Sequence, residues 1–209
     1  LFAAWKAIQQ REKSAKSALS AVEPAWREHP SYQYLEVRLQ RQLSNYREAA
    51  KLLQRVTPEA IEESSPNAWW AEMRIIARGI LDFGYSKRAY EIAAAHPKLD
   101  SGENTDAEFH AGWLSLRFNK EPKLSESHFR KMLAASDTPI TTAKAHYWLA
   151  RSLETQRDER AKSHYEQAAR HIATFYGQIA AAKLGKKLGP ISPPDIQDED
   201  KAKDRKSVV

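Results

Sequence analysis

The sequence predicts an all-α fold in which antiparallel helix pairs stack into a superhelix. The first observation is an internal repeat, because Ala107-Glu108-Phe109-His110 returns 36 residues later (143 − 107 = 36) as Ala143-Lys144-Ala145-His146. The segment Ser127-His128-Phe129 returns at the same offset as Ser163-His164-Tyr165. The second observation is the absence of any period-two alternation long enough for a β-strand. A period in the thirties is typical of helix-turn-helix solenoids, whose units bury their apolar faces only against neighbours.

In the first third of the chain, the helices are placed by apolar spacing and by proline or polar turn residues. The first predicted helix has Phe2, Trp5 and Ile8 on one face. The predicted elements are Leu1–Val22, a short segment Pro24–Trp26, a helix capped by Ser31, a turn at Ser44-Asn45, a helix Tyr46–Val56 and a short helix that starts at Thr57-Pro58.

The rest of the chain continues as helices separated by proline, glycine or polar loops. Ser65-Pro66 opens a long helix, Gly84 ends it, and Lys98–Asn104 reads as a polar loop before a helix capped by Thr105 or Asp106. The predicted helices are Pro66–Leu81, Tyr85–His96, Ala107–Phe118, Lys123–Ala135, Thr141–Gln156, Arg160–His171 and Thr174–Leu188.

The repeats are irregular, and the pattern is that of a degenerate tetratricopeptide-like solenoid. Small residues at Ala161 and Ser125 are each followed four residues later by an aromatic residue, Tyr165 and Phe129. Most units lack the glycine expected in the middle of the first helix, and only Gly112 resembles it. We therefore expect two helices to approach closely at Gly112.

Composition limits the class of protein. The 209 residues are 42% hydrophobic and 29% charged, and no apolar run reaches the roughly 20 residues of a membrane span. The absence of cysteine excludes disulfides and thiol chemistry. The net charge of +6 favours polyanionic partners, although 33 basic and 27 acidic residues are interleaved along the helices as on ordinary solvated faces. Residues 1–188 are expected to form the helical domain, and residues 189–209 a proline-rich, charged linker toward a missing C-terminal domain.

No catalytic, metal or cofactor site is expected. His110 and His146 are equivalent positions of the repeat, as are His128 and His164, but no H-x-x-x-H spacing accompanies them, so structural roles are expected. Glu62-Glu63 lies in a polar connection, where burial that would raise a carboxyl pKa is not expected. Phosphate-binding loops and nucleophile elbows are absent, and no motif indicates nucleic-acid binding.

Three motifs in order resemble one family. Residues 107–118 (AEFHAGWLSLRF), 145–152 (AHYWLARS) and 174–180 (TFYGQIA) are together similar to the superhelical region of the soluble lytic murein transglycosylases. The similarity covers most of the chain and is most specific between Trp69 and Gly185. It implies a periplasmic protein of a Gram-negative bacterium, in which a lysozyme-like domain follows the helices and cleaves peptidoglycan glycan strands to 1,6-anhydro products. The family's catalytic glutamate-serine motif with its preceding Arg-Gln pair does not occur here, so no catalytic residue is carried over.

The resemblance assigns the helical region to positioning or restraining glycan strands, and peptidoglycan would be engaged together with the missing catalytic domain. The candidate substrate-binding set is Trp70, Arg74 and Arg78, which share one helix face at i, i+4 and i+8. The alternative function is a tetratricopeptide-like adaptor that binds an extended peptide or a partner helix of another protein.

Overall fold

The structure, a computed structural model, describes residues 1–136 and 138–186. Within these residues the chain consists of helices and turns without any strand, so the all-α prediction is confirmed. None of the described helices is both long and apolar enough to cross a membrane. The predicted linker 189–209 lies outside the described residues. The last predicted helix, 174–188, is too long, because the helix there is Phe175–Lys183 and Gly185 adopts positive φ.

The described helices occur mostly as pairs joined by short turns. In chain order they are α1 Phe2–Gln9, α2 Ala15–Ser20, the 3₁₀ turn η1 Pro24–Trp26, α3 Pro30–Gln42, α4 Tyr46–Leu53, α5 Pro58–Glu63, α6 Pro66–Asp82, α7 Ser86–Ala94, α8 Ser101–Leu114, the π-helical segment η2 Ser115–Asn119, α9 Pro122–Ala134, α10 Pro139–Thr155, α11 Arg160–Ala169 and α12 Phe175–Lys183.

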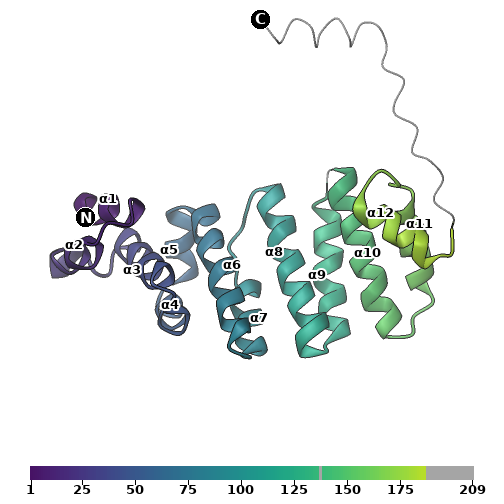
Figure 1. Cartoon of the computed structure of the whole chain (residues 1–209), viewed down its shortest axis with the longest axis horizontal. Coiled ribbons are helices and arrows are strands. Elements are labelled where there is room, and N and C mark those ends of the chain that lie inside the picture. The colour runs from purple at the N-terminus through teal and green to yellow at the C-terminus, as the bar shows by residue number, and fades with distance from the viewer. Residues whose placement is uncertain (137, 187–209) are drawn as a thin grey trace, which may run out of the picture.

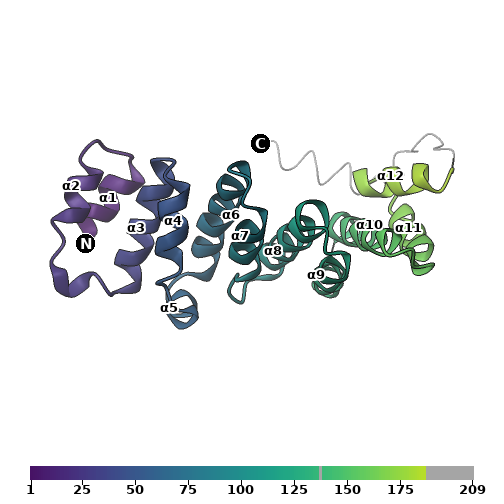
Figure 2. The ribbon, with the colours of Figure 1, turned by 90° about the horizontal axis from the view of Figure 1, so that it is seen from below.

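The helices follow one another along the long axis of the molecule (Figures 1 and 2). Each pair packs internally, as in α6 with α7, α8 with α9 and α10 with α11. The first helices of neighbouring pairs also contact one another, namely α3 with α6, α6 with α8, and α8 with α10. Side chains from these first helices therefore share one side of the row.

The turns inside the helix pairs share one backbone conformation. Each contains one residue in the left-handed region, with φ of 53° at Arg11, 60° at Ser44, 84° at Gly84, 60° at Lys120 and 58° at Arg157. Gly84 is the residue type that this conformation favours, while the other four accept a modest steric cost to reverse the chain. Sequence inspection identified Gly84 as a stop and Ser44 as a turn, but not this recurrence at non-glycine residues.

Two glycines allow helices to touch. A Cβ on Gly112 would lie 2.6 Å from Cε1 of Phe129, so α8 and α9 meet there as the sequence predicts. A Cβ on Gly79 would overlap the ring of Tyr46, so α6 also lies close to α4.

Between α3 and α6, the buried Glu72 accepts two hydrogen bonds from Arg41, at 2.6 and 2.8 Å.

Several predicted helix boundaries are wrong. The segment 1–22 is two helices, because no apolar residue lies between Ile8 and Ala15 and Arg11 adopts positive φ. Ala4, Ala7 and Ile8 form its buried face, whereas Phe2 and Trp5, which were placed on the same face as Ile8, are exposed. Ser31, the predicted N-cap, lies inside the helix, which begins at Pro30 and has His29 as its N-cap.

The predicted polar loop 98–104 is also shorter than expected. Helix α8 starts at Ser101, and Thr105 lies inside the helix, where its hydroxyl donates to the carbonyl of Gly102 at 2.8 Å. Asp100 and Gly102 were read as turn formers, but Asp100 is the N-cap of α8 and Gly102 lies in its first turn. The sequence pattern therefore did not predict the first turn of α8.

Candidate functional site

The predicted residues Trp70, Arg74 and Arg78 lie along one face of α6 and meet α8 there. The indole N–H of Trp70 donates to Oδ2 of Asp106 at 3.2 Å, and Nη1 of Arg74 donates to the same oxygen at 2.9 Å. Two side chains one helical turn apart on α6 therefore donate to the same carboxylate oxygen on α8. Asp106, which the sequence offered only as a helix cap, is the residue that joins the two helices.

One helical turn further along, Arg78 contacts His110. The Nδ1 atom of His110 lies 2.8 Å from the backbone carbonyl of Asp106, which can only accept, so Nδ1 carries the proton. Nη2 of Arg78 then donates to Nε2 of His110 at 3.0 Å. Burial lowers the pKa of His110; the backbone carbonyl and the carboxylate of Asp106 oppose this effect, and the cations Arg78 and Arg74 add to it. His110 is therefore neutral at pH 7 and leaves the charge of Arg78 uncompensated.

Trp70 is buried between α6 and α8. Its side chain is only 2% exposed, and its ring makes edge contacts with His96 and His110 at centroid distances of 6.0 and 5.8 Å. Trp70 therefore orients Asp106 and does not present a flat ring to solvent. Within the predicted set, Arg74 is partly exposed and Arg78 is exposed, so these two are available to a ligand.

The surface continues onto α10 through Lys144. Its Nζ lies 3.4 Å from the centroid of the Phe109 ring on α8, a cation–π contact. Burial lowers the pKa of Lys144; Asp106 opposes this effect, and Arg78 adds to it. Beyond Lys144, Nη1 of Arg151 donates to the hydroxyl of Tyr147 at 3.2 Å.

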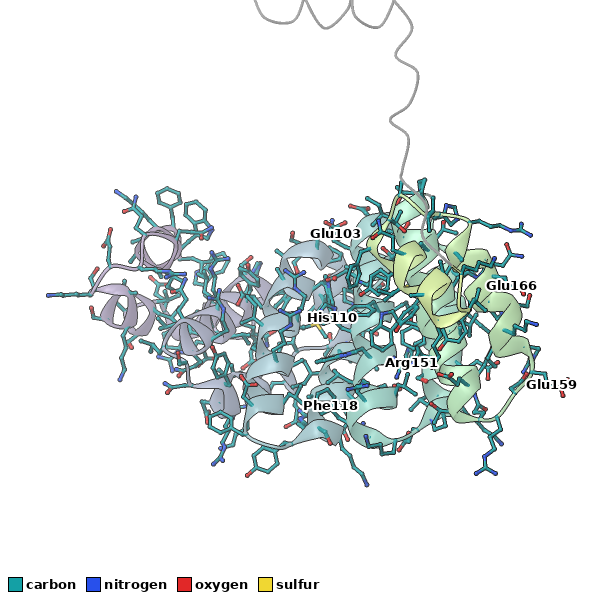
Figure 3. All side chains as sticks on the ribbon, turned by 45° about the vertical axis from the view of Figure 1, so that its right-hand side comes forward. Glu103, His110, Phe118, Arg151, Glu159 and Glu166 are labelled. Atoms are coloured by element: carbon teal, nitrogen blue, oxygen red, sulfur yellow. The ribbon has the colours of Figure 1, made fainter. Side chains whose placement is uncertain are left out.

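We call this surface the α6–α8–α10 face and define it by Arg74, Arg78, Phe109, Lys144 and Arg151. Figure 3 shows His110 and Arg151 on neighbouring helices of the row. Among the residues that the structure describes, neither Arg78 nor Lys144 forms an ion pair with a carboxylate within 4.0 Å, whereas Arg74 is paired with Asp106. The face therefore has excess positive charge beside an aromatic ring.

A small cavity opens at one end of this face. It has a volume of about 190 Å³ and lies between α6 and α8, where Arg74, Asp106 and Glu103 contribute to its lining. Pockets for drug-sized ligands typically measure about 300–1,000 Å³. The cavity is large enough for a carboxylate or a short side chain, and too small for a pair of sugar rings.

A second polar network lies behind α8 and is buried. Oε2 of Glu108 is 2.6 Å from Nδ1 of His128, and Nε2 of His128 is 3.0 Å from the hydroxyl of Tyr90. Burial alone would raise the pKa of Glu108, but hydrogen bonds from His128 and His96 hold the pKa at about 2. His96, 3.5 Å from Glu108, in turn has a raised pKa despite its burial, because of that carboxylate.

This hydroxyl–imidazole–carboxylate series has the order of groups found in nucleophilic triads. However, burial and the nearby Glu121 and Glu108 raise the pKa of Tyr90, so its phenol stays protonated. Glu108 and His128 are both enclosed by packed helices. The network is therefore a clamp that joins α7, α8 and α9.

The remaining sequence candidates are dispersed. His146 and His164, which lie on adjacent helices, contact each other through their Nδ1 atoms at 3.0 Å, while His128 is bound to Glu108 instead. Across residues 1–136 and 138–186, no three histidine or carboxylate side chains form a group that could hold a metal ion. Glu62 and Glu63 are exposed on α5.

The sequence was compared with known proteins. No protein-family model matches it, and no significant match to a curated protein was found.

Proposed function

We propose that this chain is the non-catalytic helical scaffold of a periplasmic lytic murein transglycosylase, and that its α6–α8–α10 face restrains peptidoglycan strands. The finer architecture that we propose is a solenoid of tetratricopeptide-like pairs. Its support is the recurring pair with one left-handed turn residue and the contacts between successive first helices. Cleavage of the glycosidic bond is assigned to a separate domain.

The observation that carries the proposal is that Arg78 on α6 and Lys144 on α10, the first helices on either side of α8, have no carboxylate partner among the described residues. Peptidoglycan stem peptides bear carboxylates, and a cation without a carboxylate partner binds an incoming anion without first breaking an ion pair. Phe109 under Lys144 adds an apolar surface beside the charge. Arg74 and Arg78 on α6 and Lys144 and Arg151 on α10 lie on either side of α8, an extended arrangement that suits a long polymer better than a small molecule.

The test is co-sedimentation with purified sacculi. Reversing both unpaired charges, Arg78→Glu with Lys144→Glu, should weaken binding about tenfold, since two attractions become repulsions. Arg78→Gln with Lys144→Gln should give an intermediate loss. The matched control is Lys162→Glu, an exposed cation on α11 away from this face, which should bind as the wild type does.

Two outcomes contradict the proposal. If the double charge-reversal variant binds sacculi as well as the wild type does, the α6–α8–α10 face does not take part in glycan recognition. Release of 1,6-anhydro-muropeptides by the chain alone would contradict its assignment as a scaffold.

The second candidate function is a protein-binding adaptor, and one observation favours it. An apolar cavity of about 490 Å³ lies between α1, α3 and α6, and the exposed Phe2 and Trp5 stack at its rim with ring centroids 5.8 Å apart. A peptide or partner helix with apolar side chains would fit this groove. Loss of a captured protein partner on Trp5→Ser, with no binding to sacculi by the wild type, would favour the adaptor.

A further inference from the structure

Exposed apolar side chains gather where successive helix pairs turn. Leu43 precedes the α3–α4 turn, Phe83 and Tyr85 flank Gly84 in the α6–α7 turn, and Phe118 lies before the turn into α9. Their exposed fractions are 52% for Leu43, 50% for both Phe83 and Tyr85, and 41% for Phe118. We call these four residues the turn edge.

The turn edge lies on one side of the molecule. The turns α3–α4, α6–α7 and η2–α9 all fall along the lower edge in Figure 1, and Figure 3 shows Phe118 there, far from Glu103 at the opposite end of α8. Contacts link the turns into a continuous surface. The guanidinium of Arg47 lies over the rings of Phe83 and Tyr85 at 4.8 and 5.2 Å, α7 packs against η2, and Phe118 contacts Trp113 at 4.9 Å.

Basic residues surround these apolar side chains. The exposed cations at the same turns are Arg47, Lys87, Arg117, Lys120 and Lys123. The exposed acidic residues there are Glu48, Asp82 and Glu121, of which Glu48 is already paired with Lys51 at 3.3 Å. The edge therefore has net positive charge around its aromatic rings.

We propose that the turn edge docks onto the surface of an anionic phospholipid bilayer, with Phe83 and Phe118 entering the headgroup layer. Aromatic rings next to Lys and Arg are the combination that the interface between headgroups and acyl chains favours. Basic residues near an anionic leaflet each contribute attraction that salt weakens. Because the rings project from separate turns in a row, they suit a flat and deformable surface better than a peptide, which needs a groove.

The contact is peripheral and does not require a membrane-spanning helix. Left-handed backbone at Ser44, Gly84 and Lys120 reverses the chain within a few residues, and the exposed apolar side chains lie within two residues of these positions. The α6–α8–α10 face is composed of different residues. Membrane docking at the turn edge and glycan binding at that face are thus separable by mutation.

The experiment is flotation of the chain with vesicles of two compositions, an equimolar mixture of phosphatidylglycerol and phosphatidylethanolamine, and pure phosphatidylcholine. The chain should float with the anionic vesicles at low salt, bind them less at high salt, and leave the phosphatidylcholine vesicles unbound. Phe83→Ser with Phe118→Ser should lower the apparent affinity by about tenfold or more, since each ring loses its apolar contact.

Phe118 also contacts Trp113, so loss of its ring could disturb the fold. A second variant therefore tests the charges alone. Lys87→Glu with Arg117→Glu leaves the apolar residues in place and should also cost about tenfold. The control Ile140→Ser removes a still more exposed apolar side chain at the start of α10, away from these turns, and should not change flotation. Binding of sacculi should be unaffected by all three variants.

Failure of the wild-type chain to float with the anionic vesicles would overturn the proposal. Equal flotation with both vesicle types would do so as well, as would wild-type flotation of the charge variant. Binding of another protein that is lost in the Phe83→Ser, Phe118→Ser variant, together with no vesicle binding by the wild type, would also overturn the proposal, because a protein would then cover this surface.

Discussion

Helix α8 takes part in two polar networks that differ mainly in access to solvent. On one side Asp106 and His110 meet α6, where Arg74 is partly exposed and Arg78 is exposed. On the other side Glu108 is buried with His128. A similar set of residue types therefore gives a buried network around Glu108 and, on the α6 side, a partly exposed network in which Arg78 has no carboxylate partner among the described residues.

The largest expected effect is on the buried side. Glu108→Ala should lower the free energy of unfolding by about 3 kcal/mol or more, because His128 and His96 lose their acceptor inside the protein. Urea denaturation measures the change, with the exposed Glu103→Ala of the same helix as control. Binding to sacculi should persist under native conditions. A loss below about 1 kcal/mol, the net contribution of one ordinary hydrogen bond, would show that the clamp does not hold the helices together.

Packing on α8 gives a second, smaller contrast. Gly112→Leu should destabilise the protein by roughly 1–3 kcal/mol, because the added side chain meets the Phe129 ring. Gly102 has open space around its Cβ position, so Gly102→Ala should be neutral or stabilise by up to about 1 kcal/mol through helix propensity. Equal denaturation midpoints for the two variants would mean that α8 and α9 are not in close contact.

The smallest effect is a pH dependence at the α10–α11 contact. Burial and the adjacent His164 lower the pKa of His146 to about 4, from about 6.5 in the unfolded chain. The unfolded state therefore binds more protons between these values, and the stabilisation present above pH 6.5 is lost as pH falls toward 4. Denaturation at pH 7 and pH 5 should show a larger loss of stability for the wild type than for His146→Gln.

Comparison with His146→Gln isolates the contribution of His146 from those of the other titrating groups. His110 and His164 also have lowered pKa values, so their contributions change with pH in the same direction as that of His146. His96 has a raised pKa, so its contribution is fully present below about pH 6.5 and is lost as pH rises through its folded pKa, which is the opposite direction. Glu108, with a pKa of about 2, contributes fully above about pH 4.5 and loses its contribution as pH falls toward 2. An identical pH response in the wild type and His146→Gln would contradict the account of the histidine pair.

Much of the helical framework could be predicted from local sequence signals. Pro58, Pro66, Pro122 and Pro139 each begin a helix, because the missing N–H of proline costs nothing in a first turn. The close contact at Gly112 was also predictable, since a glycine inside an otherwise regular helix indicates a neighbour that leaves no room for a side chain.

The partners across helices could not be predicted in the same way. Sequence spacing placed Arg74 and Arg78 on one face of α6, but which residue of α8 meets them depends on the angle and register between the helices. For the same reason Trp70 was expected at a groove and instead lies buried against His96 and His110. The left-handed residues Lys120 and Arg157 had no sequence signal, because neither is glycine or asparagine.

Binding to two forms of the same polymer tests recognition of stem-peptide carboxylates by the α6–α8–α10 face. Binding of the chain to intact sacculi should be at least about tenfold tighter than binding to glycan strands from which an amidase has removed the stem peptides, because the carboxylates that face Arg78 and Lys144 are then absent. This difference should disappear in the Arg78→Glu, Lys144→Glu variant. Equal binding of the wild type to both polymers would contradict the account.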